Sequence, residues 1–454
     1  MADDVTPRTR QGWPERVLRP FAEVRAGEAV TALVLAGTLF LLLTAYYLLK
    51  VIREPLILMS GGAEVKAYAA AGQALLLLPV LRLHGAVARR VGRLALIAAV
   101  LLFVATTLLA FAGLLWARVS IGIAFYLWVG TFNYLLVATF WSFANDVYTP
   151  EQGKRLFAIV GLGSSMGALA GAALAGWLLK HLSPLALMLI AAGILAGAVI
   201  SFGWLDHRNG RRPPTAGQKP VRSEPLTGPG GFQALLQDRY LLLVALLTLL
   251  ANWVLNSSEY VLDKTLLDLA HGVADPVRFV GQFKATYFWW VNLVGVVGQL
   301  FIVSRVLKHL GVGGALLLLP IVSLLGASAM LLLPALGLIR VAKIVEKGTD
   351  YSVQTTGLNA LYLVVSRDAK YKAKAVIDTF VVRAGDVCAA AAIWIGAHHG
   401  FPARGFAAVN LVLSVVWFTV ALRVRALHRS RSGEPASSVE HRAPAVASAC
   451  AAVA

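Results

Sequence analysis

Hydrophobic runs of about 20 residues, long enough for an α-helix to cross a bilayer, recur along the whole chain. Short polar segments separate them, and the second run is the weakest of the set. The runs lie at about 29–58, 67–83, 94–116, 119–143, 157–179, 184–205, 239–262, 279–304, 312–333, 336–364, 376–397 and 403–422. The pattern predicts an all-α polytopic membrane protein with twelve transmembrane helices.

A Pro- and Gly-rich basic segment separates the sixth run from the seventh and divides the chain into two six-helix halves. A weak internal repeat supports this division, because YYLLKVIRE can be laid on NWVLNSSEY, with Arg53 opposite Glu259. Two such halves with sites near their interface are the plan of one large transporter class. The expected parts are a cytoplasmic N-terminal segment (1–28), a first half (29–205), a cytoplasmic basic linker (206–238), a second half (239–422) and a cytoplasmic disordered tail (423–454).

Composition agrees with a membrane protein: 58% of residues are hydrophobic, 14% are charged and the mean hydropathy is +0.72. A net charge of +18 could suggest nucleic acid, but most basic residues gather in alternate loops, as the positive-inside rule requires. The other loops are assigned few cations, among them Lys66 and Lys284. We therefore expect a multi-pass protein of the cell membrane, a bacterial inner membrane, with both termini cytoplasmic and no nucleic-acid partner.

The run at 336–364 is unusual because charged residues occupy its middle. Ionisable groups at membrane depth are costly and persist where they face protein or water. Spacings of three and four place the polar members on one helical face, namely Arg340, Lys343, Lys347, Asp350 and Gln354, with Glu346 nearby. This stripe predicts a helix that lines a cavity.

Charged residues also occur inside the first and seventh runs. Lys50 and Arg53 lie three apart, next to Pro55, where a kink or break is expected because proline cannot donate its N–H. The two cations either face the cavity or snorkel to the outer interface. Glu259 either pairs with a cation or carries a coupling proton.

Two further runs carry recognisable patterns. The eleventh contains Arg383 and Asp386, which form an internal ion pair or contact substrate. The fifth contains Gly163, Gly167 and Gly171 at intervals of four, which predicts close helix packing and no ligand role.

Known catalytic and metal-binding signatures are absent from the sequence. There is no phosphate-binding G-x-x-x-x-G-K-[ST], no H-E-x-x-H and no nucleophile elbow. The two cysteines, Cys388 and Cys450, fit neither a disulfide framework nor a zinc site. We expect no enzyme activity, no metal and no cofactor.

The loop after the second run, GAVARRVGR, resembles the signature G-x-x-x-D-R-x-G-R of the major facilitator superfamily. Gly85, Arg90, Gly92 and Arg93 match it, while Arg89 stands where the family has Asp. The resemblance implies the major facilitator fold and a gating role for this loop.

Several stretches in both halves resemble the nucleotide transporter family of plastid and parasite ATP/ADP translocases: AYYLLKVIREPLIL, FWSFANDVYTPEQGKRLFAIVGLGSSMGA, KGTDYS and KYKAKAVIDTFVVRAGD. The resemblance implies a nucleotide-binding role for Arg53, with Lys50 as a second cation. In the family, the eleventh transmembrane helix begins with a lysine-rich segment. The resemblance matches that segment to Lys370, Lys372 and Lys374, followed by Asp378 and Arg383. Two positions depart from the ATP/ADP exchangers: Asn359 replaces a functional Glu, and Asp386 replaces a basic residue.

The hypothesis from the sequence is a secondary transporter, expected to be monomeric, that carries an organic anion by exchange or with protons, a nucleotide being one candidate. The expected substrate-binding residues are Lys50, Arg53, Glu259, Arg340, Lys343, Glu346, Lys347, Asp350, Arg383 and Asp386. The expected gating residues are Gly85, Arg90, Gly92, Arg93, Lys370, Lys372, Lys374 and Asp378. The alternative is a membrane receptor or assembly partner that kept the fold without transport.

Overall fold

The computed structural model describes residues 24–25, 28–210, 231–365 and 367–432, and these form helices joined by short turns. The first group contains α2 (Ala29–Ala88), α3 (Arg93–Trp116), α4 (Gly122–Val147), α5 (Pro150–Leu178) and α6 (Pro184–Gly210). The second group contains α7 (Gly231–Gln237), α8 (Arg239–Ala270), α9 (Pro276–Val297), η1 (Gly298–Ile302), α10 (Val303–Leu332), α11 (Leu336–Thr349), η2 (Asp350–Gln354), α12 (Thr355–Leu361), η3 (Tyr362–Val364), α13 (Arg367–Val376), η4 (Ile377–Val381), α14 (Val382–His398) and α15 (Ala403–Ser432).

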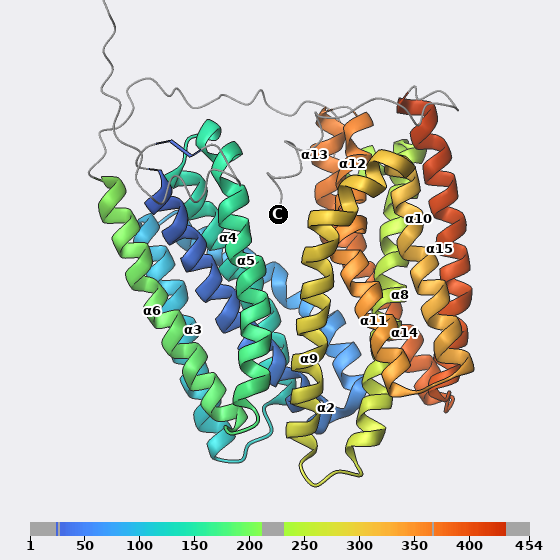
Figure 1. The fold of residues 1–454 in the computed structure, drawn as a ribbon, viewed down its shortest axis with the longest axis horizontal. Helices are drawn as coiled ribbons and strands as arrows, with labels where there is room; N and C mark the ends of the chain where they lie inside the picture. Colours follow the sequence, from blue (N-terminus) through green and yellow to red (C-terminus); the bar gives the residue numbers. More distant parts are fainter. Residues whose placement is uncertain (1–23, 26–27, 211–230, 366, 433–454) are drawn as a thin grey trace, which may run out of the picture.

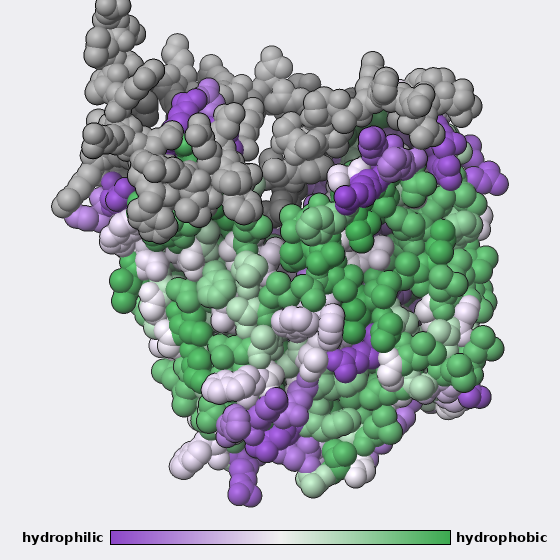
Figure 2. Space-filling model, viewed as in Figure 1, coloured by the Kyte–Doolittle hydropathy of each residue, from purple (hydrophilic) through white to green (hydrophobic). Residues whose placement is uncertain are grey.

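The two groups of helices stand side by side, and the lower part of α2 lies between them (Figure 1). Contacts between the groups run from α2 and α5 to α8, α9 and α14. Green apolar surface covers most of the middle of the face in Figure 2, and hydrophilic surface gathers toward its upper and lower edges. This distribution suits a protein surrounded by lipid at mid-height.

Within the described residues, nine helical segments are long and apolar enough to cross a membrane. Two of them, Ala29–Ala88 and Pro276–Leu332, are far longer than one crossing needs. A straight helix of 60 residues would extend about 90 Å, roughly three times the hydrocarbon thickness. Each contains a glycine with non-helical backbone, Gly62 or Gly311, at which the chain changes direction. The exact number of twelve crossings stays a prediction.

The break in α2 lies at Gly62 and not at Pro55, where the sequence led us to expect it. Gly62 has φ 79° and ψ −179°, which only glycine adopts without strain. Pro55 keeps helical backbone inside α2. The break lets α2 descend and then rise again, so that both of its parts reach the centre of the molecule (Figure 1).

The glycines of α5 pack against α2, which confirms their expected role. A Cβ at Gly163, Gly167 or Gly171 would collide with the carbonyl oxygens of Ala36, Phe40 or Thr44 respectively. The Thr44 hydroxyl donates to the Gly167 carbonyl over 3.3 Å. The absence of side chains therefore brings the two helix backbones into direct contact.

The start of α2 is fastened to the start of α5 by Glu28. Burial opposes ionisation of this carboxylate, but hydrogen bonds from Arg155, the Arg25 N–H and Gln152 outweigh it and hold the Glu28 pKa below its usual value. The Arg155–Glu28 ion pair spans 3.1 Å.

Helical structure extends past two of the expected boundaries. The tail was expected to begin at 423, but α15 continues to Ser432, and α6 continues to Gly210. Residues 231–237 of the expected linker form α7. The other linker residues, 211–230, and the parts of the terminal segments at 1–23, 26–27 and 433–454 lie outside the described residues.

Candidate functional site

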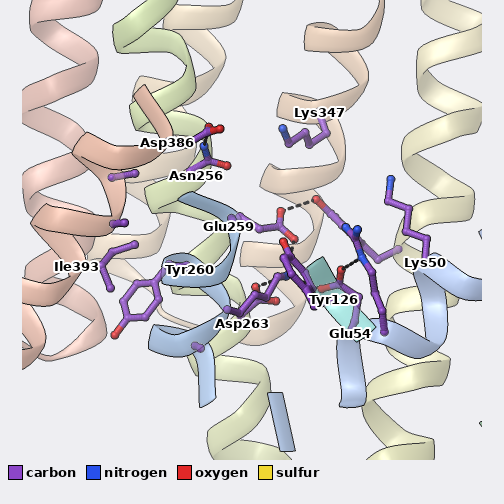
Figure 3. A pocket seen from close by; sticks show the side chains of 18 of the residues that line it. Lys50, Glu54, Tyr126, Asn256, Glu259, Tyr260, Asp263, Lys347, Asp386 and Ile393 are labelled. Atoms are coloured by element: carbon purple, nitrogen blue, oxygen red, sulfur yellow. Dashed lines mark hydrogen bonds and ion pairs between the residues drawn. The ribbon is translucent and has the colours of Figure 1, made fainter. Parts of the chain in front are cut away.

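A cavity of about 180 Å³ lies where the two groups of helices meet (Figure 3). The first group supplies residues of α2 and α4, and the second supplies residues of α8, α9, α11, α14 and η2. The polar and aromatic lining residues are Lys50, Arg53, Glu54, Lys66, Tyr126, Asn256, Glu259, Tyr260, Asp263, Tyr287, Phe288, Lys347, Tyr351 and Asp386.

Lys50 contributes a cation to the cavity with aromatic rings around it and no carboxylate. Its Nζ lies 4.5 Å from the centre of the Phe288 ring and 4.8 Å from that of Tyr47. Among the described residues no carboxylate lies within ion-pair distance of Lys50. Cation–π contacts hold a lysine in place and leave its N–H groups able to donate.

Two further cations line the same cavity. The Arg53 guanidinium stacks on Tyr126 at 4.5 Å, and its Nε donates to Glu54 over 3.1 Å. Its terminal nitrogens donate no hydrogen bond within the described residues. Lys347 lies 3.7 Å from Asp350, a loose pair. Figure 3 shows Lys50 and Lys347 projecting into one space from different helices. This part of the cavity is suited to an anionic group.

The opposite side of the cavity carries Asn256 and Asp386 (Figure 3). The Asn256 amide donates to Asp386 over 2.6 Å, and Arg383 donates to the other carboxylate oxygen over 2.9 Å. Arg383 also donates to the Tyr134 hydroxyl over 2.6 Å, which links α14 to α4 of the first group. The expected ion pair between Arg383 and Asp386 is therefore present.

A largely buried cluster of charges forms part of the cavity wall, and we call Glu54, Lys66, Glu259, Asp263 and Lys284 the ionic seal. Lys66 of α2 contacts Glu54 and lies 2.5 Å from Asp263 of α8. Lys284 of α9 lies 2.5 Å from Asp263 and 2.9 Å from Glu259. The side chain of Lys284 is 0% exposed.

The charges of the ionic seal balance once Arg53 is included. Three cations then face three carboxylates, which satisfies the requirement that buried charges be paired. The neighbouring pair of Lys343 and Glu346 balances itself. Because these charges cancel, Lys50 adds net positive charge to the cavity.

Half of the expected substrate-binding residues line the cavity, namely Lys50, Arg53, Glu259, Lys347 and Asp386. For Lys50 and Arg53 this position contradicts the alternative of snorkelling to the interface. Glu259 is paired with Lys284, and it also accepts from Tyr287 over 3.0 Å.

The other expected residues do not line the cavity, and the helix from Leu336 explains why. Lys343 is fully buried, donating to the Leu255 carbonyl over 3.2 Å and contacting Glu346, so it packs against α8. Arg340 stacks on Phe283 of α9 at 5.0 Å. The π-helical turn η2, starting at Asp350, shifts the register of the residues that follow it. The expected stripe is divided already before this turn, because Arg340 packs against α9, Lys343 packs against α8 and Lys347 lines the cavity. Arg383 and Asp350 act as partners of the lining residues Asp386 and Lys347.

Among the expected gating residues whose side chains are described, none lines the cavity. Gly85 is in α2, Arg90 and Gly92 form the turn between α2 and α3, and α3 begins at Arg93. Lys370, Lys372 and Lys374 lie in α13, and Lys374 pairs with Asp378 over 2.8 Å. The side chains of Arg93 and Lys370 lie outside the described part of the structure.

Sequence reasoning missed the ionic seal. Lys66 and Lys284 were assigned to loops, and that assignment is wrong because both are buried. Asp263 was not considered. The sequence does contain a signal for this cluster. Glu259 and Asp263 lie four apart on one helix face, and two carboxylates at membrane depth predict cations on a neighbouring helix.

A balanced ionic seal, a cationic cavity between two helical groups and an apolar belt define a polytopic transporter that takes a small-molecule substrate. The family model for the Major Facilitator Superfamily matches residues 38–345. The chain belongs to that superfamily.

Similar proteins agree with this assignment. The ADP,ATP carrier protein 1 of Chlamydia pneumoniae is 25% identical over 358 residues, which are 68% of each chain. The protein of the same name from Chlamydia trachomatis is 25% identical over 289 residues, 55% of this chain and 54% of that protein. The crystal structure of the nucleoside transporter NupG aligns with a TM-score of 0.63 and 13% identity, covering 87% of this chain and 98% of NupG. The human organic anion transporter MFSD10 aligns with a TM-score of 0.55 and 15% identity, covering 87% of this chain and 100% of that chain. At such low identity, these two structures support the fold alone.

Proposed function

We propose that the protein is a secondary transporter of organic anions, with a nucleotide as the leading candidate substrate, and that it works by alternating access. The observation that carries the proposal is the cationic side of the cavity, where Lys50 adds an unpaired charge to Arg53 and Lys347. A charge-assisted hydrogen bond contributes about 1.5–3 kcal/mol, and Lys50 can supply one with its unpaired charge. Arg53 and Lys347, which are paired with Glu54 and Asp350, add further N–H donors to the same side of the cavity. The similarity to ADP,ATP carriers supports a nucleotide.

The same proposal covers the placement of the chain. We propose a monomer in the bacterial inner membrane, with both termini and the 206–238 linker on the cytoplasmic side. The division into halves at 29–205 and 239–422 is supported by the two groups of helices in Figure 1.

Uptake into proteoliposomes tests this function. Labelled ATP is offered first against internal ADP, then against a pH gradient, and finally beside a panel of other organic anions. Saturable uptake of at least one anion is expected, and it should fall to background in Arg53→Ala and Lys347→Ala variants that express and fold normally. A folded protein that carries no anion of the panel would point to the receptor or assembly alternative.

A further inference from the structure

A second cavity, about 330 Å³ in volume, forms a groove between α5 and α9, outside the central site. Small residues form much of its lining: Ala172, Ala173 and Gly176 from α5, and Ala285 from α9. A Cβ on Gly176 would lie 3.2 Å from that of Ala285, so the two helices approach closely there. One wall belongs to each group of helices.

Polar and aromatic side chains surround this apolar groove at the end of α5. Lys180 follows the last turn of α5 and is exposed, and Gln282 faces it from α9. Neither side chain has a hydrogen-bond or ion-pair partner within the described residues. Trp177, which is 59% exposed, Thr286 and Trp289 complete the lining. Figure 2 shows hydrophilic surface rising from the lower edge near the middle of this face, with apolar surface beside it.

We propose that this groove binds one anionic phospholipid. Its phosphate would accept hydrogen bonds from Lys180 and Gln282, and an acyl chain would lie over the alanines and Gly176. Tryptophan is enriched at the depth of lipid headgroups, where an apolar body and a polar N–H are both satisfied.

The chemistry selects a lipid with net negative charge. Ala173 and Trp177 of the groove are exposed on α5, a helix apolar enough to cross a membrane, so lipid is the molecule expected around it. A lysine without a carboxylate partner is attracted most strongly to a phosphate whose headgroup carries no compensating positive charge, as in phosphatidylglycerol. Because its walls come from both groups of helices, a bound lipid contacts both at once.

Native mass spectrometry of the full chain tests the proposal independently of transport. The purified protein is titrated with phosphatidylglycerol or phosphatidylcholine in detergent, and bound lipids are counted. We expect one preferred phosphatidylglycerol on the wild type and about fivefold weaker binding in Lys180→Gln. The matched control is Arg404→Gln, which removes another exposed cation and should bind as the wild type does.

A second variant separates the groove from the charge. Ala173 is exposed, so Ala173→Phe fills the groove while keeping Lys180 and is expected to remove the preferred lipid. Melting followed by tryptophan fluorescence checks that each variant is folded. Equal binding of phosphatidylglycerol to the wild type and both variants would overturn the proposal. Displacement of the lipid by millimolar inorganic phosphate would also overturn it, because the acyl chain would then contribute nothing.

Discussion

At the scale of single residues, the surroundings of a charged side chain indicate whether it is available to bind substrate or is already paired in the protein interior. Lys343 and Lys50 both lie in helices near the cavity, but Lys343 is buried beside Glu346, whereas Lys50 contacts aromatic rings and has no ion-pair partner among the described residues. A lysine that already neutralises a carboxylate has little charge to offer a substrate. A lysine held by rings can direct its N–H groups into the cavity.

Lys50→Gln should therefore impair transport without unfolding the protein. The loss of one charge-assisted contact of about 1.5–3 kcal/mol predicts a ten- to hundredfold weaker apparent affinity for the transported anion. Stability should fall by no more than about 1–2 kcal/mol, because only cation–π contacts are lost. Competition uptake and thermal melting measure the two effects. An unchanged affinity would show that Lys50 only fills space.

At the scale of elements, glycines decide where helices touch and where they bend. The three glycines of α5 press against carbonyls of α2, while Gly161 of the same helix has open space around its Cα. In α2, Gly62 adopts backbone angles that other residues avoid, whereas Gly72 has ordinary helical surroundings. Gly161 is therefore a matched control for Gly167 in α5, and Gly72 is one for Gly62 in α2.

Gly167→Leu is expected to separate α2 from α5. Its side chain would collide with the Phe40 backbone, and such overpacking costs at least about 1–3 kcal/mol. Gly161→Leu should be neutral or slightly stabilising, because it meets nothing within 4 Å and improves helix propensity. Melting temperatures in one detergent compare the two variants, and equal values would contradict the packing seen here.

Gly62→Ala should weaken the bend of α2. A residue forced to φ 79° costs about 1–3 kcal/mol, while Gly72→Ala should cost nothing. The prediction is a lower melting temperature for the Gly62 variant alone. If the two variants have the same melting temperature, the backbone at residue 62 must have changed to relieve the strain.

At the scale of the whole molecule, the ionic seal joins the two groups of helices. Lys66 of α2 reaches Asp263 of α8, and Glu54 of α2 lies 3.9 Å from Lys284 of α9. Breaking one partner leaves an uncompensated buried charge, which is costlier than removing both. The effect of one substitution in the ionic seal on stability should therefore depend on whether its partner is also substituted.

Lys66→Ala should destabilise the protein by about 3–5 kcal/mol, and adding Asp263→Asn should recover part of that loss. Removal of Lys264, whose ion pair with Glu64 is partly exposed, should cost no more than about 1 kcal/mol. Equilibrium unfolding in mixed micelles provides the measurement. A double variant less stable than Lys66→Ala would contradict charge balance as the organising rule.

The sequence by itself determined the class of protein and pointed to five of the residues that line the cavity. The physical reason is that a bilayer imposes strong rules on each segment separately: enough apolar length, basic loops on one side, and few charges at depth. Only the tertiary structure decided which charges meet. Lys66 and Asp263 are 197 positions apart, and they become partners because Gly62 bends α2 toward α8. Likewise, helical spacing placed Lys343 and Lys347 on one face, but the neighbouring helices assigned one to the core and the other to the cavity.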